Sequence, residues 1–175
     1  AVNIDLLVYN IPIFTGVNVA PESLAKLSAV KNIVGIKEEA ELNPKQITEY
    51  VNATPDDFVI YCGDDTMIIE SFAAGGPKRI GGVVSGGSHL IGDRIRKMID
   101  LFIAGTVQEA AEMQQSFLPL FRVMAPGGRS NPVCLLKDAM NMIGYNAGIP
   151  RLPLTPGTAE EKAELRKVME KLSIL

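Results

Sequence analysis

Four short apolar stretches alternate with more polar segments along the first half of the chain. Each stretch is rich in valine and isoleucine, is bounded by turn-forming residues and is too short for a helix, so each predicts a buried strand. Their nearly continuous apolar character is typical of parallel strands covered by helices. The predicted strands are Ile4–Tyr9, Ile33–Lys37, Phe58–Cys62 and Ile80–Ser85.

Helix-start signals follow the predicted strands. Pro21 and the pair Asn43-Pro44 each open a helix, since proline is tolerated in the first turn and asparagine is a good N-cap. Asp64 or Asp65 is expected to cap a third helix. The predicted helices cover residues 21–29, 43–53, 64–74, 92–105, 107–123, 131–143 and 159–172.

The order of these elements is strand then helix, four times, followed by further helices. Such alternation predicts an α/β fold with a parallel sheet and right-handed crossovers. An open doubly wound sheet and half of a (β/α)8 barrel, which needs about 250 residues when complete, both fit. We expect residues 1–105 to form four βα units and residues 106–175 a helical region of the same domain.

Composition narrows the class of protein. The 175 residues are 47% hydrophobic and 21% charged, which excludes a disordered or fibrous chain. A net charge of −3 argues against nucleic-acid binding, and no apolar run reaches the roughly 18 residues of a membrane span. Two cysteines make no disulfide framework and no leader precedes the first strand, so we expect a cytoplasmic protein. A strand so close to Ala1 hints that the chain begins in the middle of a fold.

In both candidate architectures, functional residues gather at the carboxyl ends of the strands. Lys37 closes the second predicted strand. Burial there would lower the pKa of its amine and favour the neutral form, the nucleophile that makes a Schiff base with a carbonyl. The alternative is a lysine whose head reaches solvent or pairs with Glu38. Tyr9 ends the neighbouring strand, where its phenol could relay protons or simply pack its ring.

Other chemistry-bearing residues point less clearly to a function. The glycines of Gly81–Gly87 allow a close approach to a small ligand but lack the spacing of a phosphate loop. Asp65 could bind hydroxyl groups or only cap a helix. His89 is the only histidine and the cysteines lack metal-site spacing, so no metal site is predicted. Arg129 could meet an anion, or solvent.

Taken together, the strand-end motifs resemble one family. These motifs are Tyr9–Pro12 with Thr15-Gly16, Gly35–Glu38, Gly63–Asp65 and, near the end, Arg151–Leu154. In order and spacing they are similar to the dihydrodipicolinate synthase and N-acetylneuraminate lyase family, which comprises pyruvate-dependent class I aldolases and lyases on (β/α)8 barrels. The likeness covers nearly the whole chain but only the second half of the barrel, its last four strands and C-terminal helices.

The resemblance implies roles for individual residues. Lys37 matches the lysine that forms a Schiff base with pyruvate, and Tyr9 matches the tyrosine that shuttles the proton. Val83 and Gly82 match the strand that packs against bound pyruvate. The expected partners are pyruvate and an aldehyde, with no cofactor beyond the covalent Schiff base, in an enzyme that forms homo-oligomers.

Two departures from the family pattern affect the expected substrate. The Gly-Thr-Thr-Gly-Glu segment that holds the pyruvate carboxylate is absent from the sequence. Phe14 stands where synthases have an arginine for the carboxylate of the aldehyde, and phenylalanine cannot make that clamp. Phe14 and Thr15 look more like the branch that cleaves 2-keto-3-deoxy sugar acids, in which Asp65 and Ser85 would face the hydroxylated tail.

Glu39 makes sialic acid itself a less expected substrate, because sialic-acid lyases usually have threonine at that position. The leading hypothesis is therefore a Schiff-base aldolase or lyase, either synthase-like or acting on 2-keto-3-deoxy sugar acids. The alternative is a catalytically incomplete half-barrel that dimerises through exposed strand edges or complements a missing N-terminal half. A third hypothesis is an open α/β binding domain unrelated to aldolases.

Overall fold

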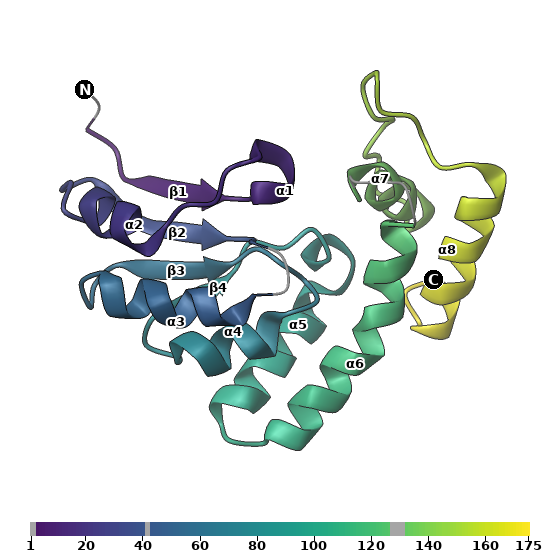
Figure 1. The fold of residues 1–175 in the computed structure, drawn as a ribbon. Helices are drawn as coiled ribbons and strands as arrows, with labels where there is room; N and C mark the ends of the chain where they lie inside the picture. The colour runs from purple at the N-terminus through teal and green to yellow at the C-terminus, as the bar shows by residue number, and fades with distance from the viewer. Residues whose placement is uncertain (1–2, 41–42, 127–131) are drawn as a thin grey trace. The chain divides into compact units, whose positions relative to one another are not determined.

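The computed structural model describes residues 3–40, 43–126 and 132–175, and the chain divides into two compact units (Figure 1). The first unit is Ala1–Ser85 and the second is Gly86–Leu175. The division places the helix that follows the fourth strand with the later helices. The expectation of a single domain with its internal boundary at residue 105 stays a prediction.

The described part of the first unit contains a four-stranded parallel sheet, as predicted. Its strands are β1 (Leu6–Asn10), β2 (Ile33–Glu38), β3 (Val59–Cys62) and β4 (Ile80–Val83), hydrogen-bonded in the order β1-β2-β3-β4. The fourth strand is shorter than the prediction, which extended it to Ser85. The helices cover one face of the sheet, so Ile36, Ile60 and Ile80 of β2, β3 and β4 are buried. The prediction of a buried first strand is wrong, because β1 is an edge strand that leaves Leu6, Leu7 and Tyr9 exposed.

Three of the helices in this unit follow the predicted positions, and one was not predicted. They are α2 (Pro21–Ser28), α3 (Pro44–Ala53) and α4 (Ile68–Gly75), and the additional helix is the single turn α1 (Pro12–Thr15). Figure 1 shows α2, α3 and α4 in a row beside the sheet. A doubly wound sheet reverses its strand order partway, whereas this order never reverses, so successive right-handed crossovers put the helices on one face.

Two predicted helix caps are corrected by the structure. The third helix begins at Ile68 rather than at Asp64 or Asp65. The Asp64 Oδ1 atom instead accepts hydrogen bonds from the Thr66 N–H and hydroxyl, both at 2.7 Å, which closes a turn before the helix. Asn43 does occupy the N-cap position of α3, but its side chain makes no capping hydrogen bond.

Apolar side chains from the sheet and the three longer helices form the core of this unit. Burying each of them stabilises the fold by about 1.5–3 kcal/mol relative to exposure. The fully buried members include Leu24, Ile36, Ile47, Ile60 and Ile68, with Phe72 and Ile80 nearly so.

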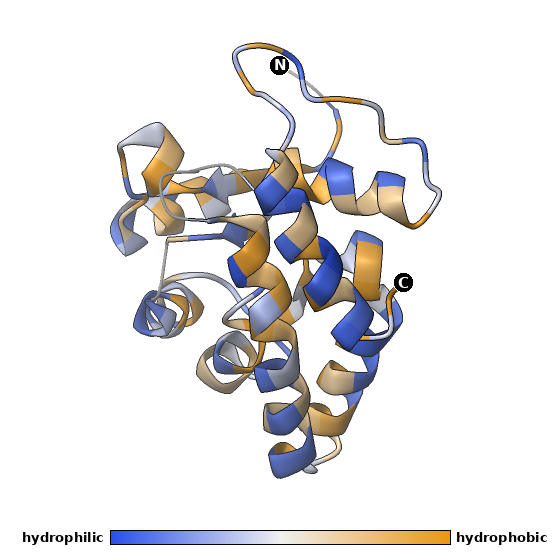
Figure 2. Cartoon of the chain, turned by 90° about the vertical axis from the view of Figure 1, so that its right-hand side faces the viewer, coloured by the Kyte–Doolittle hydropathy of each residue, from blue (hydrophilic) through white to orange (hydrophobic). Residues whose placement is uncertain are grey.

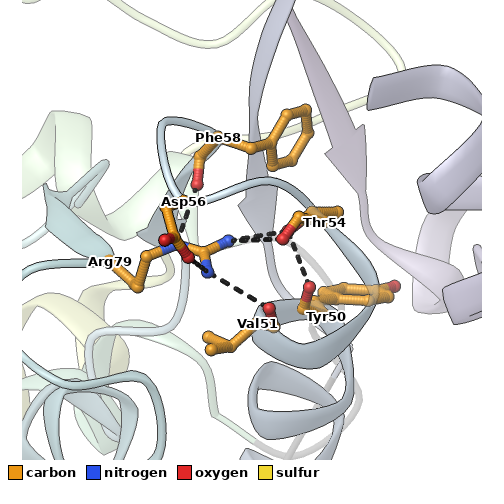
Figure 3. A network of polar contacts seen from close by, with 6 residues as sticks. All are labelled: Tyr50, Val51, Thr54, Asp56, Phe58 and Arg79. Carbon is orange, nitrogen blue, oxygen red and sulfur yellow. Dashed lines mark hydrogen bonds and ion pairs between the residues drawn. The ribbon is translucent and has the colours of Figure 1, made fainter. Parts of the chain in front are cut away.

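A buried arginine ties the amino-terminal end of the sheet to the end of α3 (Figure 3). The guanidinium of Arg79 donates to the Thr54 hydroxyl at 2.7 Å, to the Val51 carbonyl at 3.1 Å and to the Phe58 carbonyl at 3.3 Å. The Thr54 hydroxyl in turn donates to the Tyr50 carbonyl. Arg79 therefore donates to acceptors at the end of α3 and in the loop before β3 that would otherwise be buried without a hydrogen-bond donor.

The second unit is helical in the ranges described. Its helices are α5 (Ser88–Ile103), α6 (Val107–Met124), α7 (Val133–Met142) and α8 (Ala159–Lys171). Figure 2 shows that each of them carries both hydrophilic and hydrophobic residues, as expected for amphipathic helices. The buried residues of these helices include Ile95, Met98, Leu120, Leu135, Leu165 and Met169.

The ends of the second-unit helices agree only partly with prediction. A non-helical residue, Ile91, interrupts α5, so uninterrupted helix begins at the predicted Gly92 after one earlier turn. Thr158 and Glu161 form a capping box at the start of α8. The predicted start of α7 at Asn131 and the candidate Arg129 lie outside the described residues. Within the described ranges, no helix combines the length and apolarity that a membrane crossing needs.

The arginine cluster generates a stability prediction. Replacing Arg79 by methionine removes the charged donor and leaves several buried acceptors without it, so we expect the free energy of unfolding to fall by about 3 kcal/mol. The ion pair of Arg79 with the fully exposed Asp56, at 3.7 Å, is a weak contributor. Urea unfolding of Arg79→Met and of the control Asp56→Ala tests this, and equal losses in the two variants would refute it.

Candidate active site

The carboxyl ends of β1 and β2 bring Tyr9 and Lys37 together. The two residues are partners in the parallel register of these strands. The Lys37 Nζ atom donates to the Tyr9 hydroxyl oxygen at 2.7 Å and lies 4.0 Å from the centre of the tyrosine ring. The sequence placed these two residues at the ends of neighbouring strands, and the structure brings their side chains into contact, while their catalytic roles stay predictions.

A third residue, Glu39, completes this cluster. Its Oε2 atom accepts a hydrogen bond from the Tyr9 hydroxyl at 2.6 Å and forms an ion pair with Lys37 Nζ at 2.8 Å. The three polar groups thus form a closed triangle, which we call the Lys37–Tyr9–Glu39 triangle. In the sequence, Glu39 stood out only as a departure from the family pattern. Its residue type does not indicate which side chains it contacts in the folded protein.

Backbone contacts hold Glu39 in this position. Its N–H donates to the Asn10 carbonyl at 2.9 Å, which continues the pairing of the first two strands beyond β2. Gly63 follows β3 and packs directly against the triangle. A Cβ atom at Gly63 would lie only 2.8 Å from Lys37 Cε and 2.8 Å from Glu39 Cβ, so only glycine leaves room for both side chains there.

The charge of Glu39 reverses the expected behaviour of the lysine amine. Burial by itself lowers the pKa of Lys37, but the hydrogen bonds that its ammonium donates to Glu39 and Tyr9, together with the carboxylate charge, raise that pKa above its usual value. The expectation of a lowered lysine pKa is therefore wrong for this structure. Burial and the Glu39 carboxylate also raise the pKa of the Tyr9 phenol, with Lys37 opposing them.

Glu38 lies on the opposite face of β2 and does not pair with Lys37. Its carboxylate accepts hydrogen bonds from Asn10 Nδ2 at 2.9 Å, from Gln46 Nε2 at 3.1 Å and from the Ala40 N–H at 2.7 Å. Gln46 Nε2 also lies 3.0 Å from the Tyr50 hydroxyl. This buried network joins the ends of β1 and β2 to α3 directly behind the triangle. No motif in the sequence predicted it.

The other predicted site residues lie farther from the triangle. The Thr15 hydroxyl donates within its own turn, to the carbonyls of Ile11 and Val17, and the residue is exposed. Gly82 and Val83 are in β4, two strands from β2 and hence roughly 9–10 Å across the sheet. Asp65 and Ser85 are partly buried beyond the ends of β3 and β4.

Candidate metal ligands and the Cys62 thiol are the other groups to compare with the strand-end cluster. The described ranges of the chain contain no cluster of three or more histidine, cysteine, aspartate or glutamate residues that could hold a metal ion. Burial raises the pKa of the Cys62 thiol to about 11, so the thiol stays protonated near neutral pH. The amine of Lys37, which lies beside a phenol and a carboxylate, stays the predicted nucleophile at these strand ends.

A parallel sheet whose strand order never reverses, with helices on one face, defines the α/β class to which this chain belongs. Residues 1–172 match the sequence model of the dihydrodipicolinate synthetase family, and the chain belongs to that family. It is 40% identical to a 4-hydroxy-tetrahydrodipicolinate synthase of Desulforudis audaxviator, over 99% of this chain and 56% of that protein. The corresponding synthase of Archaeoglobus fulgidus is 36% identical, over 99% and 57%.

Solved structures agree with this assignment. A dihydrodipicolinate synthase from Cyanidioschyzon merolae with lysine bound superposes with a TM-score of 0.87 at 34% identity, covering 98% of this chain and 55% of that one. The synthase from Thermotoga maritima gives a TM-score of 0.86 at 31% identity, covering 98% and 57%. The chain thus spans just over half the length of these relatives. The family match supports the aldolase-like hypothesis.

The network behind the triangle generates a pH prediction. Burial raises the pKa of Glu38 above that of an ordinary carboxyl group, and hydrogen bonds from Asn10, Ala40 and Gln46 oppose this only in part. A raised pKa in the folded chain means that the folded chain holds the Glu38 proton more tightly than the unfolded chain does. Its contribution to stability is therefore full below the ordinary carboxyl pKa and is lost as the pH rises through the raised pKa.

We expect the free energy of unfolding of the unaltered chain to decline across that window relative to Glu38→Gln, which cannot ionise. Urea unfolding from about pH 4 to about pH 8 measures the difference. Glu22→Gln, at an exposed position of α2, is the matched control and should follow the unaltered chain. Parallel curves for Glu38→Gln and the unaltered chain would show that Glu38 does not titrate as described.

Proposed function

We propose that this protein is a Schiff-base aldolase or lyase that acts on pyruvate, with Lys37 as the amine. The observation that carries the proposal is the 2.7 Å contact between Lys37 Nζ and the Tyr9 hydroxyl at the ends of adjacent parallel strands. Membership of the dihydrodipicolinate synthetase family supports it, since the curated relatives are 4-hydroxy-tetrahydrodipicolinate synthases. In this proposal the four strands correspond to the last four of a (β/α)8 barrel.

The chemistry assigned to the site begins with a neutral Lys37 amine. The amine attacks the keto carbon of pyruvate and a carbon–nitrogen bond forms, while the carbonyl oxygen gains a proton. Loss of that oxygen as water leaves a protonated Schiff base. Removal of a methyl proton then gives an enamine that attacks an aldehyde, or the reverse sequence cleaves a carbon–carbon bond. Tyr9 is close enough to Lys37 Nζ to relay the protons of these steps.

One observation favours a second candidate for the aldehyde partner. Phe14, in the turn α1, is 54% exposed and offers no positive charge for a carboxylate. An uncharged aldehyde, such as the one released when a 2-keto-3-deoxy sugar acid is cleaved, suits such a position better than an aldehyde that carries a carboxylate. Thr15, Asp65 and Ser85 remain the proposed contacts for its hydroxyl groups. A cytoplasmic location and a homo-oligomeric state also stay predictions.

Trapping of the Schiff base tests the proposal directly. Incubation with pyruvate and sodium borohydride should add one reduced pyruvate unit to the intact mass, and peptide mapping should place it on Lys37. Lys37→Arg should take up no adduct, because a guanidinium is not a nucleophile at neutral pH. Lys26→Arg, in α2, is the matched control and should label normally. A folded chain with unmodified Lys37 would contradict the proposal.

Tyr9 gives a second, independent prediction. Tyr9→Phe keeps the ring against Lys37 but removes the hydroxyl that contacts both Lys37 and Glu39. We expect the rate of Schiff-base trapping to fall about 100-fold, the usual scale for loss of a proton-transfer group. Thermal unfolding should change little, because Tyr9 is 48% exposed and its hydroxyl is outside the core. An unchanged trapping rate would remove Tyr9 from the proton relay.

A further inference from the structure

In the described part of the chain, Glu39 is the carboxylate that contacts the Lys37 amine, and the residues around it hold it in that position. Its side chain is 27% exposed and that of Lys37 is 17% exposed, so the pair is mostly withdrawn from water. One oxygen, Oε2, contacts both the amine and the phenol. The glycine at position 63 leaves space for this arrangement and for no larger residue.

We propose that Glu39 is the proton acceptor for Lys37, taking the ammonium proton before the amine attacks a carbonyl and returning it through Tyr9. The proposal deepens the function proposed above and rests on it. Lys37 must lose a proton to become a nucleophile, and the Glu39 Oε2 atom at 2.8 Å is within direct transfer distance. The Tyr9 hydroxyl at 2.6 Å from the same oxygen supplies the return path.

The proton balance of this cycle closes within the triangle. The ammonium of Lys37 gives one proton to the Glu39 carboxylate, which leaves a neutral amine and a neutral carboxylic acid. The amine attacks the keto carbon, and the Tyr9 hydroxyl donates its proton to the oxygen that becomes negatively charged. The Glu39 carboxylic acid then reprotonates the Tyr9 phenolate. No oxidant or further reactant is required, and Glu39 ends as the carboxylate from which it began.

Among the residues that the structure describes, Glu39 is the base best placed for this task. From β1 the amine meets Tyr9, and from β3 its register partner is Tyr61. The Asp64 carboxylate, which follows β3, is engaged by Thr66. Glu38 points to the other face of β2, into its own network. The raised pKa of Lys37 agrees with a carboxylate that holds the proton close until a substrate arrives.

Two pH profiles test the proposal, and they separate it from the proposed function. The first is the rate at which acetic anhydride labels Lys37, followed by peptide mass spectrometry, which needs no pyruvate. In Glu39→Gln the carboxylate charge is lost, so the midpoint of labelling should move to lower pH by about one unit. Labelling below both midpoints should then be about tenfold faster than in the unaltered chain.

The second profile is the rate of borohydride trapping with pyruvate. At neutral pH, where Lys37 is protonated in both proteins, a Glu39→Gln variant that has lost its proton acceptor should trap about 100-fold more slowly, although the same amine is labelled faster by the anhydride. At high pH, where Lys37 is already neutral in both proteins, the two trapping rates should converge. Glu39→Asp should recover part of this rate, because it restores a carboxylate on a shorter side chain. Glu22→Gln, which removes an exposed carboxylate of α2, is the matched control and should leave both profiles unchanged.

Each result has a defined meaning. A shifted labelling midpoint together with slower trapping at neutral pH supports Glu39 as the proton acceptor. A shifted midpoint with trapping at neutral pH that is unchanged or faster overturns the proposal, because Glu39 would then act only through its charge. Unchanged profiles for Glu39→Gln overturn it as well. Absence of trapping in the unaltered chain, with Lys37 still labelled by the anhydride, would overturn the Schiff-base function, and the role of Glu39 with it.

Discussion

The alternation of side chains along a strand is the constraint on which the rest of the site depends. Lys37 and Glu38 are consecutive in β2 and therefore point to opposite faces of the sheet. On one face Glu38 gathers amide donors from β1 and α3 into a buried network. On the other face Lys37 meets Tyr9 and Glu39. The network that fixes the backbone at the end of β2 thus also fixes the position from which the Lys37 side chain extends.

Parallel register supplies the second half of this arrangement. Because β1 and β2 run in the same direction, their carboxyl ends coincide, and Tyr9 pairs with Lys37. The hydrogen bond from Glu39 N–H to the Asn10 carbonyl extends that pairing by one further residue and returns a carboxylate to the amine. A lysine beside a carboxylate stays protonated to a higher pH than a lysine beside a phenol alone. In the proposed mechanism, proton transfer from Lys37 to Glu39 is therefore the step on which reactivity of this site depends.

Much of the fold was predictable because its signals are local. Short apolar runs bounded by turns identified all four strands, and proline at the first helical turn located α2 and α3. The start of α4 was misplaced because Asp64 uses its carboxylate for a turn with Thr66, which looks the same in sequence as a helix cap. Choosing between a doubly wound sheet and a barrel-type order needed the strand order itself.

For this protein, the sequence by itself determined the strands, the parallel α/β class and the meeting of Tyr9 with Lys37, because strand ends in a parallel sheet share one edge. Tertiary structure alone decided that Glu39, and not Glu38, pairs with the amine. It also decided that the pKa of Lys37 rises rather than falls. The physical reason is that burial can be inferred from apolar neighbours in sequence, whereas the distance between two charges depends on how the chain beyond the strand turns back.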